Sequence, residues 1–198
     1  MTNREARAAG RPTDPVLTGR LLAAALKDLA HSGFDRLSLD TLARTEKTSK
    51  QAIYRRYANK TALAQAAIEA ALSAFVPPAP ERTNPARDLS LLLNEFRTNV
   101  FQAPVGQALA RLRFDLAFAP IAETLEQDLR FRIRQILIAT AFERDMDTRT
   151  EILISWLWQN SFCAFNARSP QDEPDMDRVV YLVLGLGSSA AERHSEPA

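Results

Sequence analysis

The stretch from Leu37 to Leu63 constrains the fold of this chain more than any other part of its sequence. Ser38 and Ser49 are residues of the type that caps helix N-termini, and apolar residues follow each of them at helical spacing. The side chains that two such short helices would bury are Leu39, Leu42, Ile53 and Tyr57. Two short helices joined by a tight turn predict a helix-turn-helix.

The side of the second helix that lacks the apolar stripe combines amide, phenol and cationic groups. These groups belong to Gln51, Tyr54 and Arg55, with Lys50 and Arg56 beside them. Such groups suit DNA base edges and phosphates better than a protein core. We therefore predict that this side of the helix contacts DNA.

The order and spacing of these residues resemble the DNA-binding domain of the TetR family of repressors. The matching positions are Ala43, Ser49, Ile53, Tyr54, Tyr57, Lys60 and Leu63, with Leu21, Ala24, Ala25, Leu29 and Gly33 upstream. The chain departs from the family pattern at the turn, where Glu46, Lys47 and Thr48 replace the usual Ala-Gly-Val. A lysine with positive φ in this turn costs of order 1 kcal/mol.

Helix geometry and the family resemblance together assign the expected DNA contacts. The residues expected to touch base edges are Gln51 and Arg55, with Lys50 at the helix start. The residues expected to hold phosphates are Ser38, Tyr54 and Lys60, helped by Thr48. Ala52 is expected to meet a thymine methyl group, and the alternative for Tyr54 is packing between helices.

The charge of the chain is divided unevenly along its length. Residues 1–60 carry 12 Lys and Arg against 6 Asp and Glu, which is a net charge of +6. Residues 61–198 carry 13 Arg and no Lys against 18 Asp and Glu, which is a net charge of −5. Positive charge on the part that holds the helix-turn-helix favours approach to a polyanion.

The sequence predicts an all-α fold, because its apolar residues recur at helical steps and show no strand-like alternation. The predicted parts are a flexible basic arm (1–12), the helix-turn-helix domain (13–63), a helical regulatory and dimerisation domain (64–188) and a tail (189–198). The arm either follows DNA or serves only as a solubilising tail. Helices are expected at 14–32 and 59–74, then from near Arg87, Pro104, Pro120 and Thr148, and at 176–184.

The last two predicted helices have almost no polar side. Thr148 and Glu151 suggest a capping box for a helix through Phe165. The apolar residues that leave this helix almost no polar side are Ile152, Leu153, Ile154, Trp156, Leu157, Trp158, Phe162, Cys163 and Phe165. Such a helix must be buried on all sides, so 148–165 and 176–186 are expected to pair with a second copy. The TetR resemblance also implies this four-helix bundle, and a two-fold dimer implies a palindromic DNA operator.

The sequence contains little that supports catalysis. Its two histidines, His31 and His194, have no evident partner, and its one cysteine, Cys163, lies among phenylalanines. No nucleotide-binding loop occurs, so we predict no enzyme, no cofactor and no metal site, with a carboxylate-only site left open. The absence of a signal peptide and of a long apolar run predicts a cytoplasmic protein without membrane contact.

The leading interpretation is a homodimeric DNA-binding repressor that a small apolar ligand releases from its operator, and the ligand follows from the resemblance alone. The candidate ligand contacts inside the larger domain are Phe96, Leu112, Phe114, Phe118, Trp158, Asn160 and Phe162. One alternative is a dimeric regulator without a small-molecule inducer. The other is an interaction protein whose helix-turn-helix no longer binds DNA.

Overall fold

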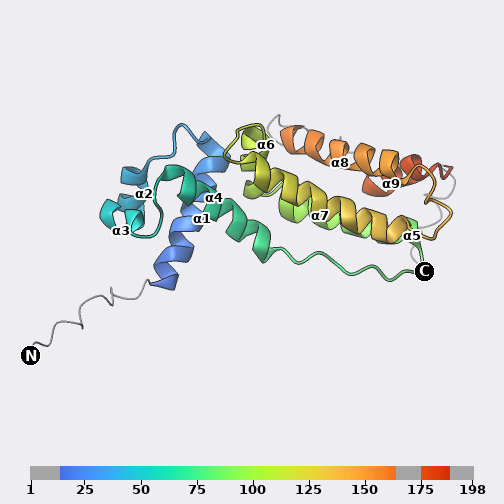
Figure 1. Ribbon diagram of the computed structural model, residues 1–198, viewed down its shortest axis with the longest axis horizontal. Helices are drawn as coiled ribbons and strands as arrows, with labels where there is room; N and C mark the ends of the chain where they lie inside the picture. Colours follow the sequence, from blue (N-terminus) through green and yellow to red (C-terminus); the bar gives the residue numbers. More distant parts are fainter. Residues whose placement is uncertain (1–13, 164–174, 188–198) are drawn as a thin grey trace, which may run out of the picture. The chain divides into compact units, whose positions relative to one another are not determined.

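The computed structural model describes residues 14–163 and 175–187, and the regular structure in these residues is entirely helical (Figure 1). The helices are α1 (Pro15–Ser32), α2 (Leu39–Thr45), α3 (Lys50–Tyr54), α4 (Lys60–Ala74), α5 (Pro85–Phe96), the π-helical turn η1 (Arg97–Phe101), α6 (Pro104–Leu112), α7 (Ala119–Leu137), α8 (Met146–Cys163) and α9 (Met176–Leu184). The predicted all-α fold is confirmed. Within the described ranges, no helix is both long enough and apolar enough to cross a membrane.

The chain forms two compact units, Met1–Ala67 and Ile68–Ala198. The boundary falls inside α4, slightly later than the predicted boundary after residue 63, because α4 continues as one helix from the first unit into the second. The predicted arm (1–12), the tail (189–198) and the helix end at Phe165 lie outside the described residues.

Helix α1 begins and ends where its sequence predicts. An Asp14 side-chain oxygen accepts hydrogen bonds from the backbone N–H groups of Val16 and Leu17, and Pro15 occupies the first helical position. Gly33 ends the helix with a φ of 80°, which side chains with a Cβ rarely adopt. These two signals fix the ends of the helix that supports the helix-turn-helix.

The apolar stripe that the sequence indicates on α1 is Leu22, Leu26 and Leu29, but the core of the first unit uses it only in part. Leu21, Ala25 and Leu29 are fully buried, whereas Leu22 and Leu26 are only half-buried. The buried residues of α2, α3 and α4 in this unit are Leu39, Leu42, Ala43, Ala52, Ile53, Leu63, Ala64 and Ala67. Tyr57 lies beyond the end of α3 and is half-buried, because α3 is shorter than predicted.

The turn between α2 and α3 is tied to α1 by an arginine. Lys47 adopts a φ of 52°, so the turn has the left-handed residue that the family pattern supplies with glycine. Arg20 Nε donates to Glu46 Oε2 at 2.9 Å, and Arg20 Nη2 donates to the Glu46 carbonyl at 3.1 Å. The unusual glutamate therefore gives this turn a side-chain and a backbone contact to α1.

In the second unit, α7 packs against α5 and α8, and α9 packs against α5 and α8 (Figure 1). Phe96, Phe101 and Phe118 are fully buried, and the ring of Trp158 meets Phe101 edge to face at 4.9 Å. The sequence places Leu116 and Thr140 on the apolar stripes of two helices, but both residues lie beyond the helix ends, because α6 ends at Leu112 and α7 at Leu137.

A π-helical turn, η1, follows α5 and brings its backbone against α6. A Cβ on Gly106 would lie 2.3 Å from the Val100 carbonyl oxygen and 2.5 Å from the Phe101 carbonyl oxygen. Apolar residues recur at helical spacing from Leu89 to Val100 in the sequence, and this pattern gives no sign of the close approach. Glycine at position 106 is therefore required by the packing of α6 on η1.

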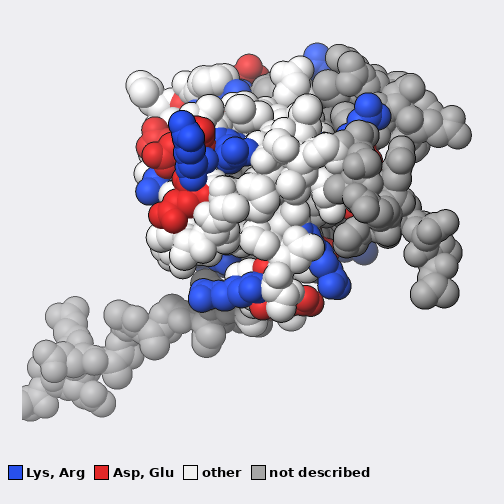
Figure 2. All heavy atoms as spheres, turned by 90° about the vertical axis from the view of Figure 1, so that its right-hand side faces the viewer, with Lys and Arg blue, Asp and Glu red and all other residues white. Residues whose placement is uncertain are grey.

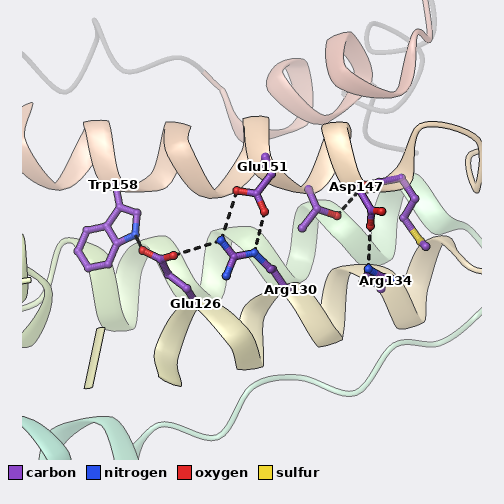
Figure 3. A network of polar contacts seen from close by, with 8 residues as sticks. Glu126, Arg130, Arg134, Asp147, Glu151 and Trp158 are labelled. Carbon is purple, nitrogen blue, oxygen red and sulfur yellow. Dashed lines mark hydrogen bonds and ion pairs between the residues drawn. The ribbon is translucent and has the colours of Figure 1, made fainter. Parts of the chain in front are cut away.

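Polar side chains join α7 to α8 (Figure 3). Arg130 Nε donates to Glu151 Oε1 at 2.7 Å, and Glu126 accepts hydrogen bonds from Arg130 at 3.2 Å and from Trp158 Nε1 at 2.8 Å. The hydrogen bond from Arg130 lowers the pKa of Glu151 below its ordinary value. The spacing of Glu126 and Arg130 in the sequence predicts an i,i+4 ion pair on a solvated face of α7. The pair is present, but Arg130 also joins this face to α8 through Glu151.

The predicted capping box at the start of α8 is also wrong. The helix begins at Met146, so Thr148 lies inside the first turn and does not cap it. Glu151 instead contacts Arg130 of α7, as described above. A favourable long-range ion pair has replaced the local pairing that the sequence suggested.

Replacement of Gly106 by alanine is expected to destabilise the second unit by about 1–3 kcal/mol, because the new methyl group would overlap backbone atoms of η1. The matched control is Gly19→Ala in α1, where no atom lies within 4 Å of the new Cβ. The control is expected to raise stability by about 0.5–1 kcal/mol through helix propensity. Thermal unfolding followed by circular dichroism measures both; equal melting temperatures for the two variants would contradict the packing described here.

Replacement of Arg20 by methionine is expected to destabilise the first unit by about 1 kcal/mol, because Glu46 loses both contacts to α1. Arg36→Met is the control, because Arg36 is exposed and no ion pair to it is found in the described residues. Urea unfolding compares the two variants. A loss of stability no larger for Arg20→Met than for Arg36→Met would show that the contact does not hold the turn.

Candidate nucleic-acid interface

Helix α3 exposes one side to solvent and buries the other. Ser49 Oγ accepts a hydrogen bond from the Ala52 backbone N–H at 3.1 Å, which fixes the start of the helix. Ile53 is fully buried between the helices of the first unit. The exposed residues are Lys50, Gln51, Tyr54 and Arg55, all of which were predicted to contact DNA.

The exposed fractions of Tyr54 and Ala52 bear on two of the predicted DNA contacts of this side of α3. Tyr54 is 48% exposed, which argues against the alternative of packing between helices. Ala52 is only 7% exposed, so its methyl group faces the core and not the surface expected to meet a thymine methyl. The sequence missed this because Ala52 directly precedes the core residue Ile53, and helical spacing alone does not fix how far the buried side extends.

Lys50 is held by an acidic residue of α2. Its Nζ donates to Asp40 Oδ2 at 2.9 Å, and this hydrogen bond raises the pKa of Lys50 above its ordinary value. Both side chains are exposed, so water screens the pair. The ammonium keeps two further donors for a base edge. The sequence gives no sign of this pair, because the two residues lie ten positions apart on different helices.

Lys60 has a structural role that the sequence analysis missed. Its Nζ donates to the backbone carbonyls of Phe34 at 3.0 Å and Asp35 at 3.4 Å, and it lies 4.4 Å from the centre of the Phe34 ring. These contacts anchor the start of α4 to the segment before α2. An ammonium has three donors, so one remains for the predicted phosphate contact.

The remaining polar residues of the helix-turn-helix fall into two groups. Ser38 caps α2 by accepting a hydrogen bond from the Thr41 backbone N–H, and it and Thr48 are half-buried. Arg56 turns inward, because its Nε donates to Thr18 Oγ1 at 3.2 Å and its Nη1 donates to the Ala52 carbonyl at 2.8 Å. Arg56 therefore fixes the end of α3 and does not belong to its exposed side.

In the second unit, positive and negative side chains lie close together. Figure 2 shows Lys and Arg intermixed with Asp and Glu at the left and lower edges of a wide uncharged area. Arg134, for example, donates to Asp147 at 2.7 Å. In the part of the chain that the structure describes, no group of three or more His, Cys, Asp or Glu is placed to hold a metal ion. The exposed side of α3 remains the strongest candidate site for DNA.

Comparison with known proteins identifies the same region. The family described as "Bacterial regulatory proteins, tetR family" matches residues 21–67, which include α2, α3 and the start of α4. The chain is 46% identical over 55 residues to the DNA-binding transcriptional repressor TetR of Mycobacteroides abscessus, covering 28% of this chain and 29% of that protein. This similarity lies in a short segment.

Two longer matches cover almost the whole chain. An uncharacterised HTH-type transcriptional regulator of Mycobacterium tuberculosis is 32% identical over 189 residues, covering 88% of this chain and 90% of that protein. The crystal structure of a TetR-like transcriptional regulator from Rhodococcus sp. RHA1 has the same fold, with a TM-score of 0.67, 19% identity, and coverage of 94% of this chain and 100% of that one. The chain therefore belongs to the TetR family of transcriptional regulators, which bind DNA and are not enzymes.

Proposed function

We propose that this protein is a homodimeric repressor that binds a palindromic operator through α3 and leaves it when a small molecule binds the second unit. The observation that carries the DNA part is the exposed side of α3, where Gln51, Tyr54 and Arg55 stand together on a helix fixed at both ends by Ser49 and Arg56. A short, firmly held helix with polar, cationic groups outward suits the DNA major groove.

The proposed contacts divide into base contacts and phosphate contacts. The Gln51 amide can form two hydrogen bonds with one base, as a donor and as an acceptor, and the Arg55 guanidinium can form two as a donor. Lys50 contributes its two remaining donors. Tyr54 and Lys60 hold phosphates, with Ser38 and Thr48 beside them. Base contacts set sequence preference, whereas phosphate contacts raise affinity for every sequence.

Binding-site selection on random duplex DNA tests this function. The full-length protein is expected to enrich one palindromic sequence, with half-sites whose centres lie about one DNA turn apart, roughly 34–36 Å. Enrichment of no sequence, with equal binding to all duplexes, would favour the interaction protein that has lost specific DNA binding.

Replacement of Arg55 by alanine is expected to relax the preference for one base pair of the selected site by about 1–3 kcal/mol. Arg36→Ala, which removes an exposed cation outside α3, is the control and should leave the preference unchanged. Competition binding between the selected duplex and single-base variants measures the preference. If Arg55→Ala retains the full preference at every position, α3 is oriented differently from our assignment.

We propose the dimer because apolar side chains of α8 and α9 are exposed in the single chain. In the single chain Ile152 is 51% exposed and Leu182 is 78% exposed, and Val179, Val183 and Leu186 are half-buried. Monomeric proteins rarely expose such apolar groups together, so a second copy is a natural cover for them. The predicted interface, 148–165 and 176–186, lies on these two helices.

Sedimentation velocity at micromolar concentration is expected to show a dimer of the 22.1 kDa chain. Replacement of Leu182 by glutamate should shift the protein to monomer, because each copy would bury a charge at the interface. The control is Phe131→Glu, which changes an exposed apolar side chain of α7. A wild-type protein that sediments only as a monomer, or a Leu182→Glu variant that remains a dimer, would contradict the proposed interface.

The ligand part of the proposal concerns the second unit. Of the predicted contacts, Phe96 lines a cavity, whereas Leu112, Phe118 and Trp158 are buried in packing outside it. Phe114 is 80% exposed, which disagrees with a place in an interior wall. The side chains of Asn160 and Phe162 lie outside the described residues.

Helix α4 supplies the proposed link between ligand and DNA. It begins at Lys60 in the first unit and ends at Ala74 in the second. If a ligand binds more tightly when the C-terminal end of α4 is in one position than in another, it changes the fraction of protein molecules in the conformation that fits the operator. A ligand with equal affinity for both states would leave operator binding unchanged. Titration of ligand-bound protein with operator therefore separates this proposal from a regulator without an inducer.

A further inference from the structure

We propose that the effector of this protein is an amphipathic amine, which binds with its protonated nitrogen at Glu69 and its apolar part between α4, α5 and α7. The proposal rests on the ligand-released regulator proposed above and adds the place and the chemical class of the ligand. The cavity that carries it has a volume of about 420 Å³ and lies entirely in the second unit.

The walls of this cavity are mainly apolar. They come from the end of α4 and the segment after it, from α5 and from α7, with Leu72, Phe75, Phe96, Ile121 and Leu125 as the main apolar residues. Phe75 and Phe96 meet edge to face, with ring centres 4.9 Å apart. A volume of this size lies within the range of small-molecule sites, and these walls accommodate a hydrocarbon or aromatic group.

The two hydroxyl groups at the cavity donate hydrogen bonds to backbone carbonyls of their own helices. Ser73 Oγ donates its one proton to the Glu69 carbonyl at 2.8 Å, and Thr124 Oγ1 donates its proton to the Pro120 carbonyl at 2.8 Å. Each hydroxyl has a single proton, so while these bonds are made the lone pairs of the two oxygens are what remains for a ligand. A ligand with hydrogen-bond donors satisfies them, whereas one with only acceptors does not.

The charges at the cavity favour a cation. Arg132 Nε donates to Asp128 Oδ2 at 2.8 Å, so the positive charge that lines the cavity is already paired with a carboxylate. The Glu69 carboxylate lines the same cavity and has no hydrogen-bond or ion-pair partner in the described residues. The lining therefore carries a net charge of −1, which attracts an ammonium group and repels a carboxylate.

The position of Glu69 connects this ligand to the proposed regulation. Glu69, Leu72 and Ser73 belong to the second half of α4, and Thr124, Asp128 and Arg132 belong to α7. An amine held by Glu69, with its apolar part against Ile121 and Leu125, would contact both helices at once. Such a ligand binds more tightly to the conformation in which the second half of α4 lies against α7 than to other conformations. This difference in affinity is what allows a ligand to regulate DNA binding.

The test compares three probes that share one apolar group and differ only at its end: 4-phenylbutylamine, 4-phenylbutanol and 4-phenylbutyrate. Because Glu69 is exposed and water screens its charge, isothermal titration of the full-length protein is expected to give affinity for the amine about two- to fivefold higher than for the alcohol or the acid. Glu69→Gln should remove this preference and leave binding of the alcohol unchanged. Glu123→Gln, an exposed carboxylate of α7 outside the cavity lining, is the matched control and should keep the preference.

Three results would overturn the proposal: no saturable binding of the amine at millimolar concentration, equal or tighter binding of the acid, or a full preference for the amine in Glu69→Gln. The operator complex is then titrated with the amine in a separate experiment. Glu69-dependent amine binding without any change in operator affinity would support the ligand site and overturn the proposed release from DNA. The two measurements therefore distinguish failure of the proposed ligand site from failure of the proposed release from DNA.

Discussion

The contact between Arg20 and Glu46 is the interaction on which the proposed DNA-binding side of α3 depends. It joins α1 to the turn before α3 through both the side chain and the backbone of Glu46. Lys47 in this turn has a positive φ, a conformation that costs a lysine of order 1 kcal/mol. Two hydrogen bonds from a guanidinium are of a size to offset that cost. The unusual turn sequence is thus compatible with an intact helix-turn-helix.

Helix α4 has contacts that hold it at each end. Lys60 binds the segment before α2 in the first unit, and Phe75, which follows the helix, packs on Phe96 in the second. The segment after Phe75 is fixed in turn, because the buried Asp88 accepts hydrogen bonds from the backbone N–H groups of Glu81 and Arg82 at 3.0 and 2.8 Å. These contacts make α4 a continuous physical connection between the proposed ligand site in the second unit and the first unit.

Local signals in the sequence predicted much of the fold, but they did not predict contacts between residues that are far apart in the chain. Asp14, Pro15 and Gly33 act within one turn of helix, so the bounds of α1 followed from their types. The exposure of Gln51, Tyr54 and Arg55 also followed from their spacing, although the burial of Ala52 did not. The partners of Lys50, Lys60 and Glu151 did not, because each is set by tertiary packing and not by neighbours in the chain. The packing of Trp158 on Phe101 was also not predicted, because aromatic residues at helical spacing fill the core as readily as they line a site.

The central claim is that the exposed side of α3 lies against operator DNA. Site-specific photo-crosslinking tests it most directly, with a photoreactive residue at Gln51 and, as a control, at the exposed Glu123 of α7. With a duplex obtained by selection, the account predicts efficient crosslinks from position 51 that map to bases within a half-site, and none from position 123. Crosslinks from position 123 alone, or crosslinks from position 51 spread evenly over unrelated sequence, would contradict it.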